Sequence, residues 1–164
     1  MQPLRSSSEF RFEKRRVDAT VTLSSGLSAR GCFFTAANDT RHDGPERVGD
    51  LLNAEAGFVP FELHDGTSAC TLLYNRAHVV MVRLHEREER HDAGFDLATP
   101  RLVSILLTTG QLVVGTVRVY RPLGRDRLSD WTRQPETFRY LETVDMTVLV
   151  NAAHIVHISE VSEP

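Results

Sequence analysis

The feature that most constrains this 164-residue chain is an internal repeat. Five blocks of the first half return in the same order in the second half. The first block reads VTLSSG at 21–26 and ILLTTG at 105–110, and the last reads LLYNRAHVVMV at 72–82 and VLVNAAHIVHI at 148–158. Such self-similarity predicts one structural unit built twice. Chance similarity between β-rich segments is the alternative, but the shared Asn-x-Ala-His and Gly-x4-Gly patterns are more specific than shared valines.

Both copies have the residue pattern of short β-strands. In the second copy apolar residues recur at every second position from 103 to 107, as expected for a half-buried pleated strand. Gly26 and Gly110 end Ser-Ser-Gly and Thr-Thr-Gly turns, where glycine accepts a positive φ. Gly31 and Gly115 fall inside the following strand, where a glycine predicts a bulge, a sharp bend or a close backbone approach. Such a bend would let a short sheet curl into a barrel.

A short helix or turn is predicted next in each copy, at 47–53 and at 127–132. In the first copy this segment places Val48, Leu51 and Leu52 on one side. The remaining strands are predicted at 58–63, 69–74 and 78–84, and at 138–142, 146–150 and 154–158. A tight turn of 3₁₀ type separates the last two strands of each copy. Each copy therefore has five short strands, and a unit this small buries only a limited core.

The predicted fold class is mainly all-β, with two five-stranded SH3-like small barrels in tandem and one short helix or turn in each. The predicted organisation is a mobile basic tail at 1–16, a first barrel at 17–84, a charged linker at 85–100 and a second barrel at 101–160. The linker pattern is compatible with one helical turn at 86–90. Pairing of the two barrels would bury more surface and would cover open strand edges.

Composition and charge disfavour several classes of protein. Charged residues make up 25% of the chain and the formal net charge is −3, with no strongly basic block, which disfavours broad electrostatic capture of nucleic acid. No apolar run is long enough for a transmembrane helix, and residues 1–16 lack the apolar segment of a secretory signal peptide. Cys32 and Cys70 form no CxxC pattern, so both are expected to be reduced core residues of a cytoplasmic protein.

The order of these residues resembles that of Sm-like proteins, a family of small SH3-like barrels. The first copy offers Leu23, Gly26, Gly31, Asp50 and Asn53, followed by Tyr74-Asn75-Arg76-Ala77 and an apolar strand. The resemblance implies tandem Sm-like barrels that bind protein partners or RNA. The second copy departs from the pattern, with Arg133 in place of Asn53 and Ala152 in place of Arg76. The tandem also resembles uncharacterised bacterial proteins with duplicated small barrels.

Equivalent polar residues flank the last turn of each copy. Asn75 and Asn151 precede the turn, His78 and His154 follow three positions later, and Arg76 adds a cation in the first copy. One interpretation is a pair of binding sites for a ligand or a nucleotide base. The other interpretation is structural, because asparagine tolerates a left-handed backbone and bonds its own backbone at turns, while a histidine can cap a strand end.

A second candidate site is an arginine cluster within 118–133. It comprises Arg118, Arg121, Arg125, Arg127 and Arg133, opposed by Asp126 and Asp130, with Tyr120 and Trp131 between them. Arginines with exposed aromatic rings can hold phosphates and stack bases. The alternative is a solvated loop with Trp131 in the core, because Trp131 aligns with the apolar Leu51.

The sequence contains no catalytic or metal-binding motif. It has no Gly-x-Ser-x-Gly elbow, phosphate-binding loop or Gly-x-Gly-x-x-Gly fingerprint. His85 and His91 are too far apart to share one helical face as zinc ligands, which stand four positions apart in such motifs. Asp50 and Asp130 each follow an arginine by three positions, the spacing of a helical ion pair or cap. We therefore expect no cofactor, no metal and no enzymatic activity.

These observations predict a non-catalytic cytoplasmic interaction or assembly module built from two Sm-like barrels. Its expected partner is another protein or a second copy of the chain, with no membrane partner. The first alternative is Sm-like binding of RNA or single-stranded nucleic acid through the arginine cluster, the basic tail and the turn at Asn75 and Arg76. The second alternative is a small-ligand sensor with one pocket in each barrel.

Overall fold

The computed structural model describes residues 13–38, 44–89, 94–120 and 126–162. They form a mainly β structure with one ten-stranded antiparallel sheet, which confirms the predicted all-β class. The strands are β1 (Lys14–Leu23), β2 (Ser28–Ala36), β3 (Phe58–Asp65), β4 (Ser68–Asn75), β5 (Val79–Leu84), β6 (Thr99–Leu107), β7 (Leu112–Val119), β8 (Phe138–Glu142), β9 (Thr147–Asn151) and β10 (Ile155–Glu160). The helical elements are α1 (Val48–Asn53), α2 (Leu128–Thr132) and the 3₁₀ turns η1 (Arg76–His78), η2 (Phe95–Leu97) and η3 (Ala152–His154).

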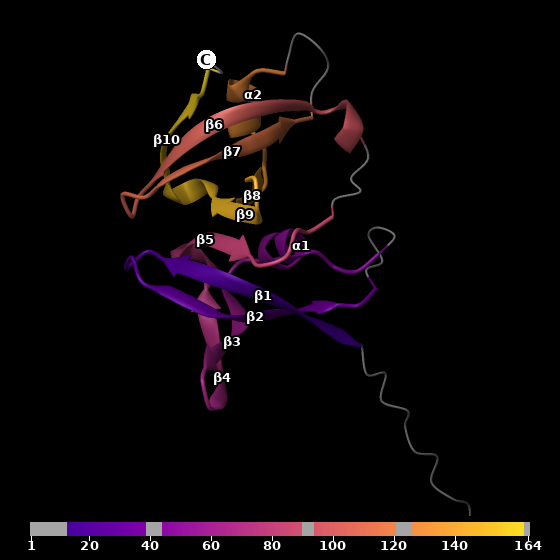
Figure 1. Cartoon of the computed structure of the whole chain (residues 1–164), viewed down its shortest axis with the longest axis vertical. Coiled ribbons are helices and arrows are strands. Elements are labelled where there is room, and N and C mark those ends of the chain that lie inside the picture. Colours follow the sequence, from indigo (N-terminus) through magenta and orange to yellow (C-terminus); the bar gives the residue numbers. More distant parts are fainter. Residues whose placement is uncertain (1–12, 39–43, 90–93, 121–125, 163–164) are drawn as a thin grey trace, which may run out of the picture.

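The first half of the structure (14–84) and the second half (99–160) share one order of elements. In each half two strands precede a short α-helix, two more strands follow it, and a 3₁₀ turn leads into the fifth strand. The strand order across the sheet is β10-β6-β7-β8-β9-β5-β1-β2-β3-β4, so the order of neighbours is also shared. Figure 1 shows β9 and β5 lying between the two halves, where they pair. The halves are therefore joined strand to strand.

Glycines shape each half at the positions that the sequence indicated. Gly26 has a φ of 86°, a left-handed conformation that confirms the predicted glycine turn. A Cβ atom at Gly31 would lie 1.9 Å from the carbonyl oxygen of Glu62, and one at Gly115 would lie 2.7 Å from that of Glu142. Of the three alternatives that these mid-strand glycines predict, the close backbone approach is the one observed in both halves.

The strand pairings leave the sheet open, and the predicted closure into two barrels is not seen. Near Gly31 only two positions of β2 pair with β3, and only one position of β7 pairs with β8. Figure 1 shows β3 and β4 running across the direction of β1 and β2. Within the described residues β4 pairs only with β3, and β10 only with β6. The turns η1 and η3 explain this, because each leads the chain away from the fourth strand of its half, so that the fifth strand pairs with the first.

Two apolar cores lie on either side of the junction and share its strands. The first core is built on Phe33 and Phe61 and also includes Leu149 from β9. The second core contains Trp131 and also includes Met81 from β5. Strands β5 and β9 thus contribute to both cores, which accounts for their nearly continuous apolar sequences. Each half completes the core of the other.

The segments outside the repeated blocks differ from the prediction at several points. β1 begins at Lys14, inside the predicted tail, and β6 begins at Thr99, inside the predicted linker. No helical turn forms over 86–89; the linker instead forms η2 near its end. Cys32 is buried as predicted, but the prediction for Cys70 was wrong, because this residue is exposed on β4. None of the described helices has the length and apolar character to cross a membrane.

Candidate assembly interface

The junction between the halves, here called the seam, is the antiparallel pairing of β5 with β9. Its paired positions are Met81 with Val150, Val82 with Leu149, and Arg83 with Val148. Every residue of β9 is buried. A ladder of this kind satisfies backbone donors and acceptors while removing apolar side chains from water on both faces. The seam therefore shows how a fourth strand of one half pairs with a fifth strand of the other half.

Asn151 fixes the end of the seam. Its Nδ2 donates to the carbonyl oxygen of Val79 at 2.9 Å and to that of Arg76 at 3.4 Å. Its Oδ1 accepts from the backbone N–H of Ala153 at 3.0 Å, and the φ of the capping residue is −78°, so the left-handed backbone considered for it does not occur. The residue is 1% exposed. Asn151 thus closes its own turn and binds the first half at the same time.

His154 adds a second polar contact across the seam. Its Nε2 lies 2.7 Å from the carbonyl oxygen of Ala77. A carbonyl oxygen only accepts, so Nε2 carries the proton of this contact. The other ring nitrogen, Nδ1, lies 2.8 Å from the hydroxyl of Thr108, which donates to it when the ring is neutral. The imidazole therefore connects the hairpin of the second half to η1 of the first half.

The corresponding residues of the first half flank η1, with Asn75 at the end of the edge strand β4 and His78 directly before β5. Asn75 Oδ1 accepts from the backbone N–H of Ala77 at 3.0 Å, and its φ of −68° is also not left-handed. His78 Nδ1 lies 2.8 Å from the hydroxyl of Ser24. The internal contacts of Asn151 and His154 are thus repeated. Among the described residues, however, Asn75 Nδ2 and His78 Nε2 have no partner that matches the contacts across the seam.

Apolar side chains on the edge strands and on β3 are exposed, whereas their counterparts in and beside the seam are buried. Leu73 of β4 is 66% exposed, whereas its counterpart Leu149 is 0% exposed. Phe58 is 60% exposed, whereas its counterpart Phe138 is 2% exposed. On the other free edge, Val156 of β10 is exposed and its counterpart in β5 is buried. The chain therefore presents at its two ends the surfaces that it buries at its centre.

Arg76 is engaged by the backbone of the first half. The residue is 6% exposed, and its guanidinium donates to the carbonyl oxygens of Phe58 at 2.6 Å and Leu51 at 3.2 Å. It therefore joins β3 to α1. The counterpart Ala152 cannot make these contacts, so the second half lacks this link.

Two more polar contacts join the halves and do not follow from the sequence pattern. Asn53 makes two hydrogen bonds with the backbone of Phe138. Its Nδ2 donates to the carbonyl oxygen at 2.9 Å, and its Oδ1 accepts from the N–H at 2.8 Å. The backbone N–H of Gly49 donates to the hydroxyl of Tyr140 at 3.1 Å. Asn53 aligns with Arg133 in the second copy. This difference between two matched positions was the one sequence signal that Asn53 makes a contact the second half does not repeat.

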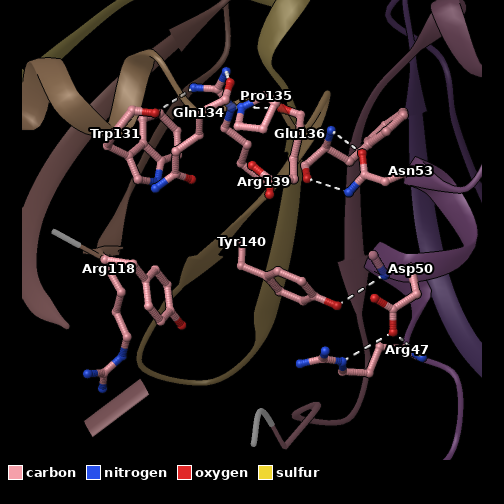
Figure 2. Close-up of a pocket in the computed structure, with 13 residues that line it drawn as sticks. Arg47, Asp50, Asn53, Arg118, Trp131, Gln134, Pro135, Glu136, Arg139 and Tyr140 are labelled. Carbon is pink, nitrogen blue, oxygen red and sulfur yellow. Dashed lines mark hydrogen bonds and ion pairs between the residues drawn. The ribbon is translucent and has the colours of Figure 1, made fainter. Parts of the chain in front are cut away.

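A cavity of about 360 Å³ opens beside these contacts, between α1, α2 and β8 (Figure 2). Its lining includes cationic and aromatic side chains from both halves, namely Arg47, Arg118, Arg139, Tyr120, Tyr140 and Trp131. Arg139 donates to the carbonyl oxygens of Trp131 and Gln134 at 2.8 and 2.7 Å, and burial lowers its pKa. Arg47 pairs with Asp50 at 3.2 Å. These two cations are therefore already engaged at the cavity wall.

The predicted arginine cluster is described only in part, since Arg121 and Arg125 lie outside the described residues. Arg118 places its guanidinium 4.0 Å from the centre of the Phe95 ring and 3.9 Å from the Glu142 carboxylate. Arg118 is thus the member of the cluster that also lines the cavity.

The remaining cluster residues belong to the α2 region. The backbone N–H of Arg127 donates to the carboxylate of Asp130 at 3.0 Å, and Arg133 lies 4.0 Å from the same carboxylate. The spacing of Arg127 and Asp130 therefore forms a helix cap, one of the two structures that it predicted. Trp131 is 2% exposed and packs in the second core, as its alignment with Leu51 predicted.

Searches of protein-family models, curated proteins and solved structures find no match to this chain. The Sm-like resemblance therefore stays a prediction. The seam and its exposed counterparts at the two ends of the sheet are the observations on which a functional conclusion can be built.

Proposed function

We propose that this protein is a non-catalytic assembly module made of two Sm-like small-barrel units, and that its partner is a second copy of itself. In this proposal β4 of one copy pairs with β10 of the next copy, as β9 pairs with β5 within the chain. The observation that carries the proposal is the exposure of Leu73 and Phe58, whose counterparts on β9 and β8 are buried in the first core. An unpaired strand edge with apolar side chains is a surface prepared for pairing.

The seam supplies the expected register. Transferring the pairing of Val82 with Leu149 through the repeat puts Ile158 of the next copy opposite Leu73. In the same transfer, Asn75 Nδ2 donates to the carbonyl oxygen of Ile155, and His78 Nε2 donates to that of Ala153. Both donors lack such partners among the described residues of the single chain. The proposed contact thus satisfies groups that the fold leaves available.

The proposed contact joins two different edges, so it is a head-to-tail interaction. Such an interaction leaves a free β4 at one end and a free β10 at the other after each addition, and it continues until a ring closes or a filament forms. The contact is expected to be weaker than the seam, because Arg133 replaces Asn53 and cannot reproduce its two hydrogen bonds to a neighbouring strand.

Paired cysteines test the contact and its register. In a Cys70→Ser background, the double variant Leu73→Cys, Ile158→Cys is oxidised with oxidised glutathione and run on a non-reducing gel. We expect a ladder of disulfide-linked multimers, because each copy offers both edges. The double variant Leu72→Cys, Ile158→Cys is the matched control, since a shift of one residue moves the thiol to the opposite face.

Three outcomes would overturn the proposal. One is a wild-type protein that is monomeric by light scattering at every concentration tested. Another is cross-linking of Leu73→Cys alone into dimers, which would show β4 pairing with itself. The third is equal cross-linking by the in-register and shifted pairs, which would show collision without a defined ladder.

A second candidate function, small-ligand binding, is favoured by the cavity between α1, α2 and β8. Its volume is within the range of ligand pockets, and its lining combines arginines and aromatic rings with the carboxylates of Asp50 and Glu136, which suits a polar aromatic ligand. A thermal shift assay with nucleoside monophosphates tests this candidate. A rise in Tm that is lost in Arg118→Gln would support it, and no rise in the wild type would reject it.

A further inference from the structure

Three potential metal ligands from three adjacent strands meet on one face of the first half. They are Asp18 of β1, Cys32 of β2 and His64 of β3, and their ligand atoms all lie within 4.8 Å of one another. Asp18 pairs with Cys32 across β1 and β2, and Cys32 pairs with Glu62 across β2 and β3. Directly paired residues project to the same face of a sheet, and so does His64, two positions beyond Glu62. The cluster is therefore a product of strand register.

Cys32 is buried without being part of either apolar core. Its neighbour Phe33 pairs with Val17 and packs in the first core, so Cys32 projects to the opposite face of the sheet. The residue is nevertheless 0% exposed. Arg16 stands two positions before Asp18 on β1, so it projects from the same face of the sheet as Cys32. Asp18 and Glu62 pair with Cys32 from either side, so the buried thiol has carboxylates beside it, a setting where a metal ion can be held.

We infer that Asp18, Cys32 and His64 bind a divalent transition metal ion of the zinc class. A thiolate, an imidazole and a carboxylate together are a donor set that zinc accepts in tetrahedral sites. Metal–ligand distances of about 2.0–2.3 Å place tetrahedral ligands about 3.5 Å apart. Small side-chain rotations of the exposed Asp18 and His64 would bring the group to that spacing. Binding releases the thiol proton to solvent.

Arg16 places a positive charge beside the proposed site, where it would compete with a bound metal ion. Its guanidinium pairs with Glu62 and lies 5.5 Å from the centre of the Phe34 ring, on the face that carries Cys32. A metal ion would repel this guanidinium, and the 56% exposure of the side chain leaves it room to turn toward solvent. Glu62 would then be available beside the site. Arg16 is thus expected to weaken metal binding rather than support it.

The second half offers an internal comparison. The positions matching Asp18, Cys32 and His64 hold Leu102, Thr116 and Val144, none of which is a common zinc ligand. The pairing of Thr116 with Glu142 repeats that of Cys32 with Glu62, so the backbone arrangement is shared and the donor atoms are not. The proposed site is therefore a feature of the first half alone, and it was missed because the residues are 14 and 32 positions apart in the sequence.

Cobalt titration of the reduced full-length chain tests the inference. We expect a thiolate-to-cobalt charge-transfer band in the near ultraviolet that is abolished by adding zinc. Cys32→Ser should remove the band, while Cys70→Ser, which alters the exposed thiol, should leave it unchanged. Asp18→Asn and His64→Asn should each weaken binding about tenfold or more, and these exposed positions keep the test valid if Cys32→Ser does not fold.

Arg16→Gln gives a result in the opposite direction. Removing the competing guanidinium should tighten cobalt and zinc binding severalfold, whereas removal of a merely structural ion pair would leave the affinity unchanged. The absence of a charge-transfer band in the folded wild type would overturn the inference. A band that survives Cys32→Ser in a folded variant, or one that is lost in Cys70→Ser, would also overturn it.

Discussion

Strands β9 and β4 have closely similar sequences and very different surroundings. The last four residues of β9 are VLVN and those of β4 are LLYN, and each strand ends at an asparagine that caps a 3₁₀ turn. Every residue of β9 is buried because β5 covers it, whereas β4 has a partner on one side only within the described chain. Burial at this strand therefore depends on its neighbour and not on its own residues.

The largest expected difference concerns the leucine shared by the two strands. Leu149→Asp would place a carboxylate in the first core and should lower the free energy of unfolding by about 4 kcal/mol or more. Leu73→Asp should change it by less than about 0.5 kcal/mol, because the side chain is exposed. The same Leu73 variant should lose self-association. Urea unfolding of dilute protein and light scattering of concentrated protein measure the two effects.

These variants separate the fold from its assembly. A Leu73→Asp protein that is folded and still associates like the wild type would mean that β4 is not the contact surface. Equal destabilisation by the two substitutions would mean that β4 is covered in the free monomer.

The next difference is expected at the two capping asparagines. Asn151→Ala removes the cap of η3 and leaves the carbonyl oxygens of Val79 and Arg76 without their amide donor, so it should cost about 2–3 kcal/mol. Asn75→Ala removes only a cap and should cost about 1 kcal/mol in dilute protein. Chemical denaturation of both variants measures the gap. Equal costs would show that the amide contacts across the seam contribute nothing.

Local patterns were sufficient to predict the elements of each half. The alternating apolar residues, the turn glycines and the mid-strand glycines determine structure within a few residues along the chain. The strands, α1, α2, η1 and η3 accordingly lie close to their predicted positions, whereas η2 was not predicted. The buried position of Trp131 also followed from the repeat, since an apolar counterpart predicts an apolar environment.

Contacts between distant segments could not be predicted in the same way. The pairing register of β1, β2 and β3 brings Asp18, Cys32 and His64 together, and the spacing of these residues along the sequence does not indicate that register. The mutual hydrogen bonds of Asn53 and Phe138 depend on how the halves pack. The open sheet also differs from the expected pair of closed barrels, because β5 pairs with β9 and β1 instead of returning to β4.

A smaller difference is expected at the two histidines. His154→Ala loses the hydrogen bond to the carbonyl oxygen of Ala77 across the seam as well as the contact with Thr108, and should cost about 1 kcal/mol. His78→Ala loses only the contact with Ser24 and should cost about 0.5 kcal/mol in dilute protein. Thermal unfolding followed by circular dichroism measures both. A larger cost for His78→Ala than for His154→Ala would show that the hydrogen bond to Ala77 across the seam does not stabilise the fold.

The smallest expected effect is at Glu88, a linker residue that touches both halves and has no counterpart in the repeat. Its carboxylate accepts from the backbone N–H of Val48 at 3.0 Å and from the hydroxyl of Tyr140. Burial raises the pKa of Glu88 above its ordinary value of 4.5, and these hydrogen bonds only partly oppose the shift. The unfolded chain therefore releases this proton at a lower pH than the folded chain.

It follows that Glu88 makes the folded state less stable as pH rises from 4.5 to the raised pKa, because the unfolded state binds fewer protons over that interval. Glu88→Gln removes this dependence. Denaturation at a series of pH values should show the variant gaining on the wild type as pH rises through this window, with a constant difference above it. A difference that is flat throughout, or that changes in favour of the wild type, would mean that the contacts of the linker with both halves hold the carboxylate in its ionised form.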